Sequence, residues 1–117
     1  MTLIFKICDA EIWAKAERDG VFPGAAIDLA DGYIHFSDTS QVRETAAKWF
    51  AGRDDLTLVA IEADALGPAL RWERSRGGAL FAHLYAALPM SAVVWSRPLP
   101  LGPNGAHDFG AVLDEAT

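Results

Sequence analysis

Two stretches of alternating residues, joined by a short turn, constrain the fold of this chain more than any other feature. Residues 70–74 and 80–85 each alternate apolar and polar side chains, which is typical of strands with two unlike faces. The intervening Ser-Arg-Gly-Gly predicts a tight connection between them. Antiparallel pairing of these strands would bring Arg71, Glu73 and His83 within reach of one another.

This expected hairpin carries groups that suit chemistry on an anion. A carboxylate such as Glu73 orients an imidazole such as His83 or raises its pKa, and Tyr85 lies on the same face as His83. Arg71, together with the arginines at 74 and 76, supplies local positive charge for a phosphate. An ordinary cross-strand ion pair, with the turn arginines in solvent, explains the same residues without a ligand.

A second polar strand face follows from the segment Asp-Gly-Tyr-Ile-His-Phe-Ser-Asp at residues 31–38. Alternation places Tyr33, His35 and Ser37 on one face, where the imidazole and the hydroxyl can bind one ligand group together. The alternative is a half-buried His35 that the backbone satisfies, with Ser37 belonging to the turn before the next helix.

The remaining pattern predicts an α+β fold with a mostly antiparallel sheet and two helices in the N-terminal half. We expect a single domain over residues 1–98 and a loosely packed tail over residues 99–117, which contain two prolines and three glycines after Leu99. Three tryptophans fall on apolar faces and are expected in the core: Trp13, Trp49 and Trp72. The further expected elements are strands at 2–8, 56–62 and 90–97, helices at 10–19 and 38–51, and a loop at 21–32.

Composition limits the functions that are open to the chain. Its 117 residues carry a net charge of −6, which argues against a nucleic-acid coat and leaves room for a small basic pocket. The one cysteine, Cys8, excludes an internal disulfide and favours a reducing cytoplasm. No stretch resembles a secretory signal or a membrane span, so we expect no membrane partner, and the oligomeric state stays open.

Other kinds of site are supported less well by the sequence. His35, Asp38, Glu73 and His83 are of metal-ligating types, but no short ligand motif is present, so we expect no metal. A serine hydrolase is disfavoured because the glycine pattern of a nucleophile elbow is missing. Cys8 is expected to be a small core residue and not a nucleophile.

The motifs taken together resemble the DUF952 family of small, mostly bacterial proteins. The resemblance rests on Trp13 with Gly20, on Asp-Gly-Tyr-Ile-His-Phe-Ser-Asp, on Leu-Arg-Trp-Glu, and on Phe-Ala-His-Leu-Tyr followed by Leu-Pro, and it covers residues 3–98. The family's usual last motif has proline and glycine where this chain has Ala82 and Ala86, a departure that relaxes the backbone and keeps His83 and Tyr85.

That resemblance implies an ADP-ribosylation-like fold, the fold of the ADP-ribosyltransferases, and therefore a ligand such as NAD. Residues 34–38 are similar to a segment of poly-ADP-ribose polymerases, with His35 at the place of a tyrosine that stacks on nicotinamide. Lys6 falls where those enzymes carry histidine, and His83 falls near the place of their catalytic glutamate. A histidine cannot supply that negative charge, so Glu73 on the adjacent strand is the candidate substitute.

Two functions follow as expectations. One is an enzyme that uses NAD, ADP-ribose or another nucleotide, with His35, His83 and Glu73 as acid/base or hydroxyl-binding groups. The other is a non-catalytic module that binds a nucleotide or small anion on the same fold, since lysine and histidine replace the usual catalytic residues. In both, the ligand-binding residues are expected to be Lys6, Tyr33, Ser37, Arg71 and Tyr85.

Overall fold

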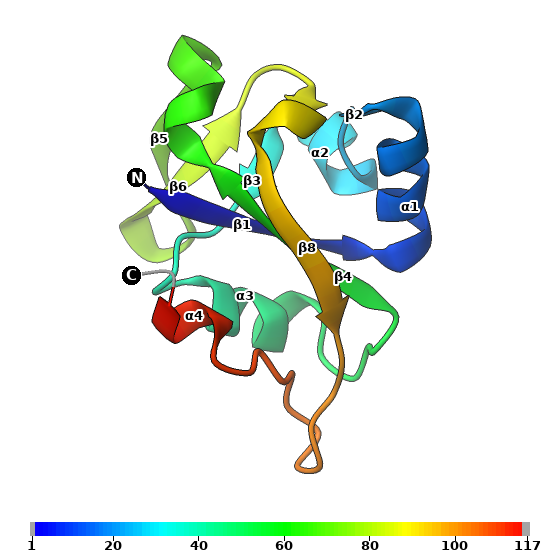
Figure 1. The fold of residues 1–117 in the computed structure, drawn as a ribbon. Coiled ribbons are helices and arrows are strands. Elements are labelled where there is room, and N and C mark those ends of the chain that lie inside the picture. Colours follow the sequence, from blue (N-terminus) through cyan, green and yellow to red (C-terminus); the bar gives the residue numbers. More distant parts are fainter. Residues whose placement is uncertain (1, 116–117) are drawn as a thin grey trace.

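Antiparallel sheets form the framework of the molecule in the computed structural model, which describes residues 2–115 without the side chains of Arg76, Asp114 and Glu115 (Figure 1). In that part of the chain, two sheets have three strands each and a third pair is short. The strands are β1 (Leu3–Asp9), β4 (Leu56–Glu62) and β8 (Val93–Leu99) in the first sheet, β3 (Ile34–Phe36), β6 (Ala79–Leu84) and β5 (Leu70–Ser75) in the second, and β2 (Val21–Phe22) with β7 (Leu88–Pro89) in the pair.

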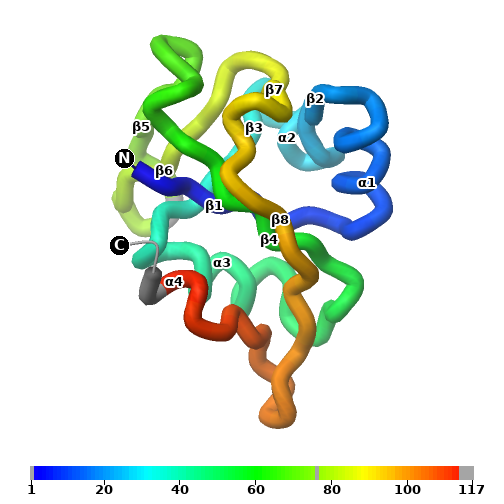
Figure 2. Tube along the Cα trace, in the orientation of Figure 1, coloured from blue at the N-terminus to red at the C-terminus, as the bar shows by residue number. Residues whose placement is uncertain are grey.

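Helices gather on two sides of the first sheet, as the Cα trace shows (Figure 2). The α-helices of the described chain are α1 (Ala10–Asp19), α2 (Ala26–Asp31), α3 (Val42–Trp49) and α4 (Val112–Glu115). Its short 3₁₀ segments are η1 (Ala63–Ala69), η2 (Arg76–Gly78) and η3 (Met90–Ala92). α1 and α2 lie beside β2, whereas α3 and α4 lie together below β1 and β4. The mixed α+β class with antiparallel sheets is therefore confirmed.

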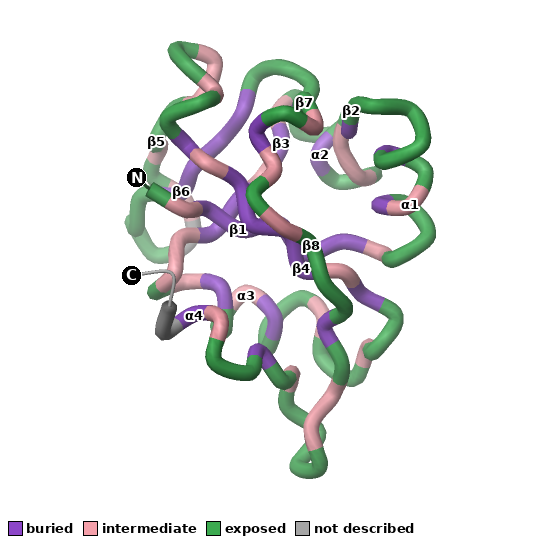
Figure 3. The backbone as a smooth tube through the Cα atoms, in the orientation of Figure 1, coloured by how far each residue is buried: buried purple, intermediate pink, exposed green. Residues whose placement is uncertain are grey.

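Each face of the β1-β4-β8 sheet covers its own hydrophobic core, and the central strand crosses the most buried part of the molecule (Figure 3). Alternate residues of β4 divide between the two: Val59 and Ile61 face a core shared with α1 and the second sheet, and Leu58 and Ala60 face α3 and the C-terminal segment. Burial on both faces explains why residues 56–62 form a nearly continuous apolar run.

The expected hairpin is confirmed as β5 and β6. They pair in antiparallel register with Arg71 opposite His83 and Glu73 opposite Phe81. The connection is η2, in which Gly77 and Gly78 take φ values of 69° and 87°, a left-handed conformation that glycine adopts without strain.

The two large sheets meet at one isolated bridge between β1 and the end of β3. Phe5 N donates to Ser37 O at 2.7 Å, and Ser37 N donates to Phe5 O at 2.9 Å. Immediately after the bridge, the turn that leads into α3 is closed by reciprocal hydrogen bonds of 3.0 Å, in which Gln41 N donates to Asp38 Oδ1 and Asp38 N donates to Gln41 Oε1. This turn follows directly on Ser37 at the junction of the sheets, and α3 itself begins at Val42.

Two segments are more ordered than the sequence predicts. Residues 21–32, expected to be a loop, contain β2 and the six-residue helix α2, which ends at Gly32 with φ 88°. Periodicity could not reveal so short a helix, because one and a half turns repeat no pattern. Residues 99–115, expected to pack loosely, bury Leu99, Phe109 and Leu113 against α3.

The tryptophans divide differently from the expectation. Trp13 is buried and packs on Phe22 with ring centroids 5.6 Å apart. Trp49 is 60% exposed and Trp72 is 41% exposed, so the prediction that both lie in the core is wrong. Helical or strand spacing identifies which face a residue is on, but not whether anything covers that face.

Candidate functional site

The two histidine-bearing strands place their polar groups on one face of the β3-β6-β5 sheet. His35 lies directly opposite His83, and Arg71 lies opposite His83 on the other side, so the three form a row across the sheet. Tyr33 packs beside this row, with its ring centroid 4.7 Å from that of His35 and 4.2 Å from that of His83. Strand pairing alone therefore assembles residues that are about 50 positions apart in the sequence.

The His35 imidazole is positioned by a buried ion pair between Lys6 and Asp28. Its Nδ1 lies 2.6 Å from Asp28 Oδ1, and its backbone amide donates to the same oxygen at 3.1 Å. Lys6 Nζ lies 2.9 Å from Oδ1 and 2.8 Å from Oδ2 of Asp28. The Asp28 side chain is only 1% exposed, so its oxygens are satisfied by these partners and by the amide of Ala25, which donates to Oδ2 at 2.8 Å.

Asp28 occupies the place where the two sheets part. β1 and β3 pair through Phe5 and Ser37, and two residues earlier on β3 the amide of His35 turns to the Asp28 carboxylate. Lys6, next to Phe5 on β1, reaches the same carboxylate. A side chain from α2 therefore closes the gap and supplies the hydrogen bonds that a longer β1-β3 ladder would supply.

The electrostatics of this cluster favour an ionised aspartate. Burial raises the pKa of Asp28, but the hydrogen bond from His35 and the charge of Lys6 outweigh it and lower that pKa to about 2. Burial also lowers the pKa of Lys6, while the adjacent Asp28 opposes this change. The aspartate is thus a fixed negative charge that orients the imidazole.

The other ring nitrogen of His35 faces a second, exposed carboxylate. Nε2 lies 2.9 Å from Asp31 Oδ2, and the Asp31 side chain is 44% exposed. Both ring contacts are hydrogen bonds only in the imidazolium form, in which each nitrogen donates. In the neutral tautomer that keeps the bond to Asp28, Nδ1 carries the proton and donates it to the carboxylate, and Nε2 carries a lone pair.

His83 belongs to a parallel arrangement with Glu73 and Tyr85. Its Nδ1 lies 2.8 Å from Glu73 Oε1, and the Tyr85 hydroxyl donates to the same oxygen at 2.6 Å. The hydrogen bonds from Tyr85 and His83 lower the pKa of Glu73, and the bond to Glu73 raises the pKa of Tyr85. The Arg71 guanidinium lies over the Tyr85 ring, 5.2 Å from its centroid.

Ligand access differs between the two histidines. A cavity of about 430 Å³ lies along β1, β3 and α3, and the His35 side chain, 25% exposed, lines it. The His83 side chain is only 4% exposed and is covered by Tyr33. The polar residues of the cavity wall are Lys6, Asp31, Tyr33, His35, Ser37, Thr45 and Ser75, and the exposed apolar ones include Ile27 and Trp49.

Three residues that were expected to bind a ligand or supply positive charge differ from the others: Ser37, Arg74 and Arg76. Ser37 lines the cavity, but its Oγ lies 2.8 Å from Thr45 Oγ1, so the hydroxyl is shared with α3. Arg74 donates from Nη1 to Gly78 O at 2.9 Å and braces the hairpin turn. The side chain of Arg76 lies outside the described residues, which leaves Arg71 as the arginine beside His83.

Asp28 and Asp31 are the site residues that the sequence analysis missed. Both lie in the segment interpreted as a loop, and the partners of Asp28 are 7 and 22 positions away. No local sequence pattern predicts the contacts of Asp28 with His35 and Lys6. A lysine at the middle of an apolar strand was the available signal, because a buried lysine requires a carboxylate partner.

The described residues contain no group of three or more His, Cys, Asp or Glu side chains placed to hold a metal ion. Cys8 is buried as a free thiol whose pKa burial raises to about 12, which agrees with the interpretation of Cys8 as a core residue. None of the helices over residues 2–115 is long and apolar enough to span a bilayer.

The fold and this site define a small α+β domain in which two antiparallel sheets part around a buried Lys-Asp-His cluster. Residues 7–96 match the model of a family described as "Protein of unknown function (DUF952)", and the chain belongs to that family. No curated protein matches the chain.

Solved structures of one relative share the whole fold. The crystal structure of protein CC0527 from Caulobacter crescentus is 49% identical, covers 97% of this chain and 99% of its own, and superposes with a TM-score of 0.91. Its solution NMR structure, also 49% identical, covers 96% and 97% and gives a TM-score of 0.85.

Proposed function

We propose that this protein is an enzyme that uses NAD, ADP-ribose or a related nucleotide, with the cavity beside His35 as its active site. The observation that carries the proposal is the Lys6-Asp28-His35 cluster, which fixes an imidazole by its Nδ1 at the wall of a cavity of about 430 Å³, where the exposed Asp31 faces its Nε2. A histidine oriented by a buried carboxylate is a common arrangement for general acid/base catalysis.

The two histidine pairs supply complementary groups. In the first pair the ring is accessible and the aspartate is buried, whereas in the second the ring is buried and Glu73 is 36% exposed. We assign His35 as the acid/base and the ionised Glu73 as the carboxylate that stabilises a developing positive charge on ribose or binds its hydroxyl. His83 and Tyr85 then act as positioning residues for Glu73, since both bond its Oε1.

The remaining residues fit ligand binding. Tyr33 offers a ring beside His35 for a planar group such as nicotinamide, and Ser37 offers a hydroxyl on the same wall. Arg71 supplies positive charge for a phosphate at the edge of the sheet. Two antiparallel sheets that part beside the site support an ADP-ribosyltransferase-like fold, which we include in the proposal together with a cytoplasmic location.

Nicotinamide release from NAD by the purified protein tests this proposal. We expect release above the background of NAD alone, and at least a hundredfold loss of it in His35→Ala. Lys48→Ala, which changes an exposed lysine paired with Glu44 on the outer side of α3, is the matched control. No release by the unaltered protein, or equal release by His35→Ala, would exclude this activity.

A binding module without catalysis is the second candidate, and the burial of His83 favours it. That residue lies near the place where the similar enzymes carry glutamate, and Tyr33 covers it. Isothermal titration with NAD, ADP-ribose and inorganic phosphate separates the candidates. Binding that His35→Ala weakens, without turnover, supports the module, and no binding of any of the three excludes both candidates.

A further inference from the structure

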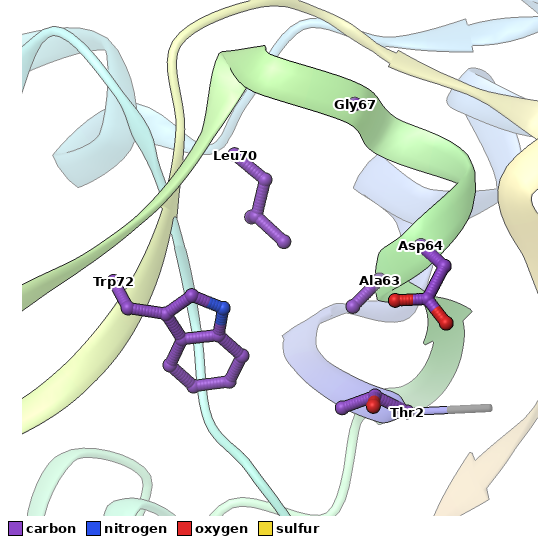
Figure 4. A pocket seen from close by; sticks show the side chains of 6 residues that line it. All are labelled: Thr2, Ala63, Asp64, Gly67, Leu70 and Trp72. Carbon is purple, nitrogen blue, oxygen red and sulfur yellow. The ribbon is translucent and has the colours of Figure 1, made fainter.

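On the opposite face of the β5-β6 hairpin, an exposed tryptophan and a carboxylate line a separate hollow of about 310 Å³ (Figure 4). Trp72 and Leu70 come from β5, Ala63, Asp64 and Gly67 from η1, and Thr2 from the start of the chain. The indole ring and the Asp64 carboxylate lie on different sides of the hollow. Its volume is at the lower end of those of small-molecule sites, so a ligand here is small.

The exposed indole at Trp72 has a structural cause. Trp72 pairs with Ala82 on β6, and β5 is the outer strand of its sheet. Trp72 is 41% exposed because the Ala82 side chain opposite it is small and no further strand of the sheet lies beside β5. An indole face that is open to a hollow attracts cations more strongly than any other aromatic side chain.

Asp64 is the charged residue among those that line the hollow, and Glu62 lies beside it. Among the side chains that the structure describes, which leave out that of Arg76, neither Asp64 nor Glu62 forms an ion pair with a lysine, an arginine or a histidine. Glu62 Oε2 accepts instead from the backbone amides of Thr2 at 3.1 Å and Asp64 at 3.2 Å, which brings the two acidic residues together. Two arginines of β5 have other partners: Arg74 donates to Gly78 O at the turn, and Arg71 lies over Tyr85 on the other face of the hairpin.

We propose that this hollow is a binding site for a small organic cation, such as a quaternary ammonium or methylated amine, which lies against the Trp72 indole and is neutralised by Asp64. The indole quadrupole and the carboxylate attract the same charge, whereas a neutral ligand of equal shape gains only from apolar contact. A methylated ammonium suits the hollow better than a bare ammonium, because its methyl groups also contact Leu70 and Ala63. The site is independent of the cavity at His35.

Choline and its neutral isostere 3,3-dimethylbutan-1-ol are the probes. We expect choline to shift the Trp72 indole N–H resonance in an NMR titration of the ¹⁵N-labelled protein, and to bind at least fivefold more tightly than the isostere. Trp72→Leu should weaken choline binding at least fivefold and Asp64→Asn at least threefold. Trp49→Leu and Asp54→Asn, which change an exposed tryptophan and an exposed aspartate outside the hollow, should leave it unchanged.

Equal binding of choline and the isostere would overturn the proposal, since the hollow would then be an apolar depression without preference for charge. No shift at Trp72 would overturn it as well. Equal weakening by Asp54→Asn would assign the effect to the net charge of the protein, and equal weakening by Trp49→Leu would place choline at another tryptophan; either result would overturn the proposal. Because no outcome depends on NAD, the result is independent of the proposed enzyme activity.

Discussion

The two histidine-carboxylate pairs on the β3-β6-β5 sheet have the same bond and opposite exposures. His35 and His83 each place Nδ1 within 2.8 Å of a carboxylate oxygen. In one pair the carboxylate is 1% exposed and the ring 25%, and in the other the carboxylate is 36% exposed and the ring 4%. The hydrogen bond between histidine and carboxylate therefore does not by itself define the role of a pair. The role depends on which member remains accessible, so the first pair offers an imidazole and the second a carboxylate.

Removing the buried charge at Asp28 should have the largest effect on stability. Asp28→Asn leaves the Lys6 ammonium buried without its counter-ion, and we expect a loss of about 3–5 kcal/mol in the free energy of unfolding by urea denaturation. Asp31→Asn, which changes the exposed partner of the same histidine, should cost about 0–1 kcal/mol. The double variant Lys6→Met with Asp28→Asn should recover part of the loss, because no charge stays buried. Equal losses of unfolding free energy in Asp28→Asn and Asp31→Asn would show that the buried carboxylate contributes no more to stability than the exposed one.

Exchanging each histidine for glutamine should separate catalysis from stability. His35→Gln is expected to lower nicotinamide release by about 10²–10⁴-fold, the range for loss of a general acid/base, with little change in unfolding. His83→Gln removes a buried partner of Glu73 and should cost about 1–3 kcal/mol of stability. Activity assays and urea denaturation of both variants test this division. A larger activity loss in His83→Gln than in His35→Gln would reverse the two roles.

Acid should weaken the fold through Asp28. Its pKa falls from 3.8 to about 2 on folding, so the ionised form stabilises the folded state above pH 4. That contribution, about 2 kcal/mol, is lost as the pH falls from about 4 to 2. Urea denaturation between pH 6 and 2 should show this loss in the unaltered protein and a smaller one in Asp28→Asn. A parallel pH dependence in both proteins would exclude Asp28 as its source.

The smallest expected effect concerns the second pair. The hydrogen bond to Glu73 raises the pKa of Tyr85, so Glu73→Gln should return the phenol to a lower pH of ionisation. The chain has two tyrosines, which makes ultraviolet titration readable, and Tyr85→Phe identifies the remaining transition as that of Tyr33. An unchanged titration in Glu73→Gln would show that the phenol and the carboxylate are not bonded in solution.

The sequence was sufficient for features that depend on local order. Alternation and a glycine turn predicted the β5-β6 hairpin and the approach of Glu73 to His83. These predictions succeed because strand period and turn-forming glycines are properties of a few neighbouring residues. The row of Arg71, His83 and His35 required one further step, the pairing of β3 with β6.

Asp28 shows why the remainder could not be predicted. Its role depends on a helix of six residues and on a gap between two sheets, and neither leaves a periodic signal. The exposure of Trp49 and Trp72 has the same origin, since what covers a face is decided by distant segments. Tertiary packing, and not local propensity, places these residues.

The position of Asp28 also changes the chemistry of the outer edge of β3. A strand edge with unpaired amides is a template for another chain, and over residues 2–115 no strand pairs with the outer edge of β3 beyond its bridge to β1 at Ser37. The Asp28 carboxylate takes the amide of His35 on that edge. A strand that approached this amide would have to displace a carboxylate that Lys6 holds in place, so the ion pair that orients the imidazole also makes strand addition at His35 costly.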